Sequence, residues 1–116
     1  MEVLIALFFS GHNKTKNRGK LDIVREILNI ASVKARKTRI MYQANLSFVQ
    51  LERYLQNLLE NGLIEFFDGA FYLTTPHGKE FLLMHSKYLM LRQRLSEEVA
   101  ETEKSRLQLE SMCFKK

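Results

Sequence analysis

The fold of this chain is decided by residues 63–74, which read LIEFFDGAFYLT. Two runs rich in aromatic and β-branched residues flank the dipeptide Asp68-Gly69. This dipeptide favours a tight type I′ turn, in which both central residues have a positive φ. The stretch therefore predicts a β-hairpin with strands over 63–67 and 70–74.

A helix is predicted directly before the hairpin. Ser47 precedes Gln50 by three residues, which is the spacing of a capping box at a helix start. Gly62 suits a left-handed cap at the other end. Apolar spacing predicts a buried stripe of Phe48, Leu51, Leu55, Leu58 and Leu59. The opposite, exposed face would carry Gln50, Arg53 and Asn57.

Two more helices are predicted upstream of this one. Apolar residues recur at steps of three and four over residues 20–32, at Leu21, Val24, Ile27, Leu28 and Ala31. A basic link, 33–37, follows. A short helix then begins near Thr38 and directs three residues inward, Ile40, Met41 and Ala44, before Asn45-Leu46 breaks it.

After the hairpin, a long helix is predicted. Thr75 is its N-cap, Pro76 is its first residue, and no other proline follows through Lys116. A helix over 76–111 would be about 54 Å long, too long to be buried on the remaining 80 or so residues. Its apolar seam has one extra step of four, so it predicts a pairing surface and not a long regular parallel zipper. The alternative is a frayed helical tail. The seam consists of Met84, Tyr88, Leu91, Leu95, Val99, Thr102, Arg106, Leu109 and Cys113.

The N-terminus carries an apolar run, residues 3–9, before a basic, turn-prone segment. Seven residues cannot span a bilayer, which needs ~20, and no positive charge precedes the run as in a secretory signal. We expect a short strand or an arm packed on another subunit. The expected organisation is an arm and linker at 1–19, a domain at 20–75 and a dimerisation helix at 76–116.

The charge distribution points to a polyanionic partner. The 116 residues carry a net charge of +5, and residues 11–54 alone hold ten bases against three acids. A solvated face without function is the alternative. One cysteine, Cys113, excludes an internal disulfide and a clustered-thiolate zinc site, and it fits a reducing cytoplasm.

Catalysis is not expected. His12, His77 and His85 are scattered along the chain without a two-histidine metal spacing. No phosphate-binding glycine loop, nucleophile elbow or cysteine–histidine pair is present in the sequence. We therefore expect no catalytic residue, metal, cofactor or small-molecule substrate, and no membrane association.

Three helices followed by a hairpin form the element order of a winged helix-turn-helix. The predicted fold is thus mostly α with a small β-hairpin (α+β), followed by a long C-terminal coiled-coil helix. The third helix of such a domain enters the major groove, where Gln50, Arg53 and Asn57 suit base edges. The basic segment before the second helix suits phosphates through Lys34, Arg36, Lys37 and Arg39.

The sequence also resembles a known family. The stretches KTRIMY at 37–42 and ANLS at 44–47, then Tyr54 and a hairpin leading through Leu73-Thr74 to Gly78, are similar to the small Sulfolobus chromatin proteins of the Sso ten a type. The resemblance covers roughly 20–105. It implies a homodimer joined by an antiparallel coiled coil, a DNA-binding domain at each end and little sequence specificity. The chain departs from the family in the run at 3–9 and in a wing tip without a base.

We therefore expect a cytoplasmic protein that binds double-stranded DNA, and the resemblance implies that it is archaeal and nucleoid-associated. Two alternatives stay open, an operator-specific winged-helix regulator and a protein-binding scaffold that uses the hairpin aromatics, and so does RNA as the ligand. The expected dimer contacts are Met84, Tyr88, Leu91, Leu95, Val99, Thr102 and Leu109. The expected DNA contacts are Lys20, Arg36, Lys37, Thr38, Arg39, Tyr42, Ser47, Gln50, Arg53, Tyr54 and Asn57.

Overall fold

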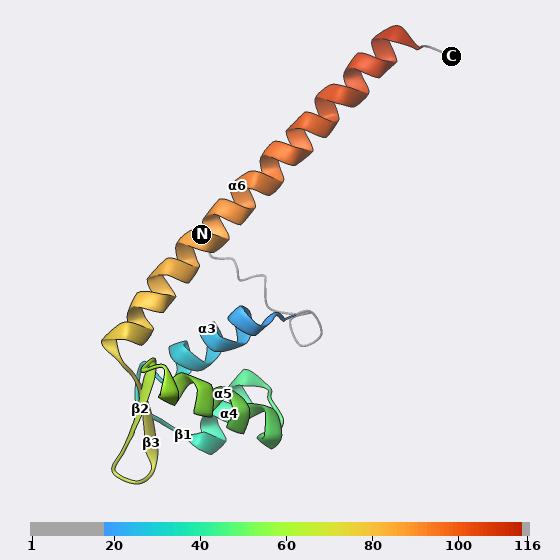
Figure 1. Cartoon of the computed structure of the whole chain (residues 1–116). Coiled ribbons are helices and arrows are strands. Elements are labelled where there is room, and N and C mark those ends of the chain that lie inside the picture. Colours follow the sequence, from blue (N-terminus) through green and yellow to red (C-terminus); the bar gives the residue numbers. More distant parts are fainter. Residues whose placement is uncertain (1–17, 115–116) are drawn as a thin grey trace. The chain divides into compact units, whose positions relative to one another are not determined.

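The computed structural model describes residues 18–114 (Figure 1). The expected N-terminal arm and His12 lie outside this range. The predicted order of three helices, a hairpin and a long helix is confirmed. The elements are α3 (Lys20–Ile30), β1 (Ala35–Arg36), α4 (Lys37–Ala44), α5 (Phe48–Glu60), β2 (Ile64–Phe67), β3 (Phe71–Thr74) and α6 (Pro76–Cys113).

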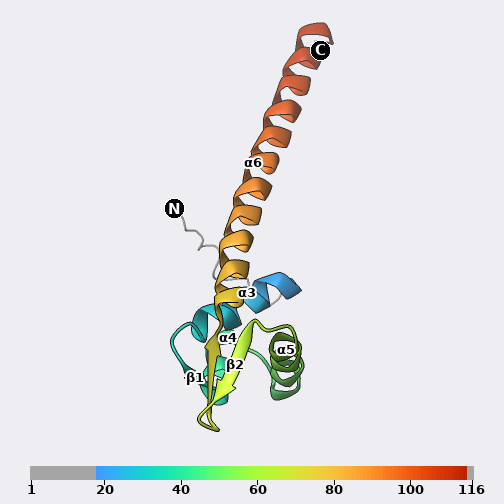
Figure 2. The same ribbon diagram turned by 60° about the vertical axis from the view of Figure 1, so that its left-hand side comes forward.

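The sheet has three antiparallel strands in the order β1-β3-β2, where the sequence predicted two (Figure 2). Ala35 pairs with Tyr72 and Arg36 with Phe71. The interpretation of 33–37 as a plain link was therefore wrong. Two residues are too few to show the alternation that marks a strand, and β1 exists because the edge of β3 offers it hydrogen bonds.

The turn of the hairpin is confirmed, and the strand after it is one residue shorter than predicted. Asp68 and Gly69 have φ values of 55° and 64°. The amide of Ala70 donates to the carbonyl of Phe67 over 3.2 Å. Both features are those of a type I′ turn. Because Phe67 pairs with Phe71, Ala70 is an extra loop residue and β3 begins at Phe71, not at 70.

The core of the domain lies where α3, α4, α5 and the sheet meet. Ile27, Leu28, Ile40 and Leu51 are its largest fully buried side chains. Leu21, predicted to be inside, is 48% exposed, and Ile23 is buried in its place. Ile23 lies four residues before Ile27 and therefore above it on one face of α3.

Both predicted caps of α5 are present. The hydroxyl of Ser47 accepts from the amide of Gln50 over 3.2 Å, and Oε1 of Gln50 accepts from the amide of Ser47 over 3.1 Å. Gly62 has a φ of +74° beyond the end of the helix. The predicted buried stripe was too wide, because only Leu51, Leu55 and Leu58 are buried. Phe48 and Leu59 lie at its flank and are exposed.

Thr74, at the end of β3, closes the C-terminal end of α3. Its buried hydroxyl donates to the carbonyl of Leu28 over 2.7 Å, and its amide donates to the carbonyl of Ala31 over 2.9 Å. The last carbonyls of a helix have no partner within the helix. The hairpin thereby satisfies groups that α3 would otherwise leave buried and unpaired.

The beginning of α6 is tightly packed against the loop before β2. Thr75 caps it as predicted, since its hydroxyl accepts from the amide of Gly78 over 3.1 Å. A Cβ atom on Gly78 would lie 2.3 Å from the carbonyl oxygen of Leu63. No side chain fits between these two backbones.

Replacing Gly78 by alanine is expected to lower the free energy of unfolding by about 1–3 kcal/mol, as overpacking usually does. The higher helix propensity of alanine offsets about 1 kcal/mol of the strain. Urea unfolding measures the difference. The neighbouring Lys79→Ala, at an exposed position, is the control and should change little. A Gly78→Ala variant as stable as this control would contradict the close approach.

The chain divides into two compact units, and the boundary lies after Leu83, within α6. In the first unit, Phe81 and Leu82 of α6 pack on the core. In the second unit, every described residue from Met90 onward is exposed. No helix among residues 18–114 is both long enough and apolar enough to cross a membrane.

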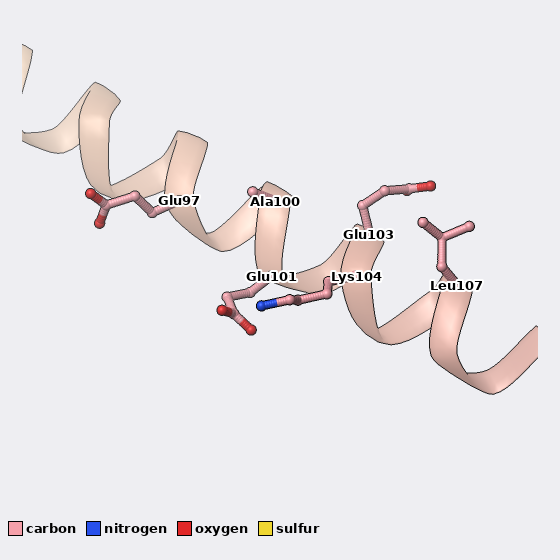
Figure 3. A pocket seen from close by; sticks show the side chains of 6 residues that line it. All are labelled: Glu97, Ala100, Glu101, Glu103, Lys104 and Leu107. Carbon is pink, nitrogen blue, oxygen red and sulfur yellow. The ribbon is translucent and has the colours of Figure 1, made fainter. Parts of the chain in front are cut away.

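The second unit is a bare helix along most of its length. The hollow drawn in Figure 3 is lined by residues of α6 alone, among them Glu97, Ala100 and Leu107. It is the open surface of one helix and encloses no ligand site.

Candidate nucleic-acid interface

The face of α5 opposite its buried leucines presents polar and basic side chains to solvent. Gln50, Arg53 and Asn57 are all exposed. Among the described residues, Arg53 has no carboxylate within ion-pair distance, so its five N–H donors are available. Gln50 is engaged in the cap through its carbonyl oxygen, which leaves its two amide protons to donate.

Lys37, at the start of α4, is not a free cation. Its ammonium forms an ion pair with Glu52 of α5 and lies 5.2 Å from the ring centre of Phe48. The hydrogen bond to Glu52 raises the pKa of Lys37. The ammonium stays charged, but the adjacent carboxylate offsets its attraction for a phosphate. The pair also joins the first turn of α4 to the second turn of α5.

Lys34 and Arg36 approach the hairpin instead. The ammonium of Lys34 lies 4.6 Å and the guanidinium carbon of Arg36 4.8 Å from the ring centre of Phe71. Such cation–π contacts attract both charges to one aromatic ring. The turn at the wing tip carries no basic residue, yet Arg36 of β1 and Lys34 just before it lie over Phe71, the first residue of β3 after the turn. The sequence showed these bases but gave no sign that Phe71 holds them, because β1 was not predicted.

The other expected contacts are distributed over three elements. Thr38, Arg39 and Tyr42 are exposed on α4, and Tyr42 is 79% exposed. Tyr54 is half-buried against the core, and Ser47 is committed to the cap. Lys20 is exposed at the first position of α3.

Arg18 is a residue that the sequence interpretation missed. Its guanidinium donates to Glu26 of α3 over 2.6 Å, to the carbonyl of Ala44, and to that of Asn45 over 3.0 Å. Its side chain is only 7% exposed. Arg18 thus satisfies the end of α4 and fixes the turn that leads into α5. No local pattern distinguishes it from the solvated bases around it.

The turn between α4 and α5 is held in a specific backbone conformation. Asn45 has a φ of 56°, in the left-handed region that asparagine tolerates better than most residues. Leu46 is buried beside it. These two residues and Arg18 set where α5 begins.

The aromatic side chains of the hairpin are mostly engaged with one another. Tyr72 is buried and its ring centre lies 4.9 Å from that of Phe66, while Phe67 and Phe71 are 6.0 Å apart. Phe66 is the exposed member of the four. This leaves a small apolar surface for a protein partner. Residues 18–114 contain no group of three or more histidine, cysteine, aspartate or glutamate residues that could hold a metal ion.

Comparison with known proteins agrees with this arrangement. Residues 17–93 match a family model described as a winged helix-turn-helix. The chain belongs to the winged helix-turn-helix family. In this winged helix-turn-helix domain, α5 is the third helix and the β2–β3 hairpin is the wing.

The fold is also similar to the crystal structure of Sso10a-2, a DNA-binding protein from Sulfolobus solfataricus. The TM-score is 0.64 at 27% sequence identity, and the match covers 78% of this chain and 96% of that one. The resemblance to the Sso ten a type is thereby confirmed.

Two uncharacterised proteins of the archaeon Methanocaldococcus jannaschii are similar in sequence. MJ0287 is 37% identical over 88 residues, which are 72% of this chain and 91% of the relative. MJ0290 is 39% identical over 66 residues, which are 56% of this chain and 31% of the relative. The chain therefore spans about a third of the length of MJ0290.

Proposed function

We propose that this chain binds double-stranded DNA with α5 in the major groove. The observation that carries the proposal is the exposed face of α5, where Arg53 has no acidic partner among the described residues. Asn57 and the amide protons of Gln50 flank it. Arginine suits guanine, and asparagine and glutamine suit adenine.

The phosphate contacts would come from α4 and β1. Arg39 on α4 is exposed, and Lys34 and Arg36 lie over the ring of Phe71 in the wing. Lys37 should contribute less than its neighbours, because Glu52 is already its partner. Phosphate contacts of this kind would fix the position and orientation of the domain on the duplex.

The sequence specificity would be low. Only three of the expected contacts, all on α5, are polar side chains that suit the edges of nucleobases. More of the expected contacts are basic or hydroxyl side chains, which suit phosphates. Phosphate contacts carry no direct sequence information. An architectural, nucleoid-associated role in an archaeal cytoplasm follows more readily than control of one operator. The similarity to Sso10a-2, which is described as a DNA-binding protein, supports DNA as the ligand.

A second copy of the chain would cover α6. The seam residues Met84, Leu91, Leu95, Val99 and Leu109 are exposed, and so is Tyr88. An apolar stripe of this length on an isolated helix is typical of a pairing surface. Arg106 within the seam is held on its own helix by Glu103 and Glu110. The family resemblance favours an antiparallel coiled coil.

The test is a fluorescence anisotropy titration of the full chain with a duplex DNA and the matching duplex RNA at several salt concentrations. The logarithm of the DNA affinity should fall linearly with the logarithm of salt, by ~0.9 per neutralised phosphate. RNA should bind more weakly, since its deep, narrow major groove excludes a helix. An affinity for DNA that does not respond to salt, or tighter binding to the RNA, would contradict the proposal.

A further inference from the structure

The outermost ridge of α5 begins with an apolar residue. Val49 and Arg53 lie one turn apart, and each stands two positions from a buried leucine, Leu51 or Leu55. Two positions correspond to about 200° around a helix, so both side chains point directly away from the core. Val49 is 64% exposed.

Val49 has no structural task within residues 18–114. It does not belong to the hydrophobic core or to the residues packed against it. Its neighbour Phe48 differs, because the ammonium of Lys37 lies over its ring. Valine also has a lower helix propensity than unbranched residues, so its presence does not favour the helix. A single exposed valine is ordinary on a surface. What distinguishes Val49 is its place, in the first turn of α5 and one turn before Arg53.

We infer that Val49 contacts the C5-methyl group of thymine and favours sites with a thymine beside the base that Arg53 reads. The inference rests on the proposed function and adds a specificity-determining residue to it. The first residues of a recognition helix are those that reach base edges. The one apolar group on the major-groove edges of the four bases is the thymine methyl. The stiff, branched side chain of valine meets it with little loss of conformational freedom.

The nucleotide arm of the test removes only that methyl group. Two duplexes of the same AT-containing sequence are compared, one with thymine and one with deoxyuridine at every thymine position. The full chain should bind the thymine duplex about fourfold more tightly, the ratio that corresponds to about one buried methyl group. Anisotropy at low salt measures both affinities.

The protein arm assigns the contact. In Val49→Ala the preference for the thymine duplex should fall to near one, with the affinity for the deoxyuridine duplex unchanged. Val33→Ala, at another exposed valine between α3 and β1, should keep the fourfold preference. Circular dichroism confirms that each variant folds.

Equal affinity of the unmodified chain for both duplexes would overturn the inference while leaving the proposed function standing. A preference that survives in Val49→Ala but disappears in Phe48→Ala would also overturn it. Failure to bind either duplex at low salt would overturn the proposed function itself, and the inference with it.

Discussion

An Arg18→Ala variant is expected to lose about 3–5 kcal/mol of its free energy of unfolding, the usual result of breaking a buried ion pair by removing one partner. The guanidinium makes hydrogen bonds to Glu26 and to the carbonyls of Ala44 and Asn45. Glu26 is largely buried too. Its carboxylate and the two carbonyls would lose their partner together, and a buried group without a partner costs its desolvation.

Urea unfolding of Arg18→Ala, Glu26→Ala and the double variant measures this effect and the coupling between the two residues. The double variant should be more stable than the sum of the single effects predicts, because it leaves no uncompensated charge. Lys20→Ala removes an exposed cation nearby and should change stability little. A loss of less than about 1 kcal/mol in Arg18→Ala would show that the buried pair does not hold the turn before α5.

Substituting lysine for Leu91 and Leu95 is expected to convert the proposed dimer into a monomer. Both side chains lie in the exposed apolar seam of α6. Four charges in one coiled-coil interface would be forced together without partners. The affinity for a long duplex should also fall by about 10²-fold, because two linked DNA-binding domains bind far more tightly than one.

Light scattering gives the mass, and anisotropy gives the affinity. The matched control is Gln93→Lys with Ala100→Lys, which adds the same charge to exposed positions of α6 outside the seam. This control should stay dimeric and bind DNA at least as well. If the seam variant keeps the mass of the unmodified protein, residues 84–112 are not the dimer interface.

The features that sequence predicted correctly depend on short-range geometry. The turn at Asp68-Gly69, the capping box of Ser47 and Gln50, and the start of α6 at Thr75 each need only a few adjacent residues. Their chemistry is complete within four or five positions, so the sequence contains all that determines them.

The features that sequence missed depend on residues far apart. Strand β1 exists because β3 lies beside it. Arg18 is buried because the folded chain brings it to the end of α4, where it donates to the carbonyl of Ala44, 26 residues away in the sequence. The exposure of Phe48 depends on how far the core extends around α5. At the site, Gln50, Arg53 and Asn57 were placed on the exposed face by periodicity alone. The contact between Lys37 and Glu52 and the cation–π contacts with Phe71 were not, since both need the packed domain.

The central claim is that α5 reads the major groove, and it is tested most directly by a pair of charge-matched substitutions. Arg53→Ala removes a cation from α5, and Lys104→Ala removes one from an exposed position of the second unit. Their affinities for one duplex are measured by anisotropy at a fixed salt concentration. Arg53→Ala should bind about tenfold more weakly, since a bidentate contact with a base contributes about 1–3 kcal/mol, while Lys104→Ala should change affinity less than about twofold. Equal affinities for the two folded variants would contradict the account.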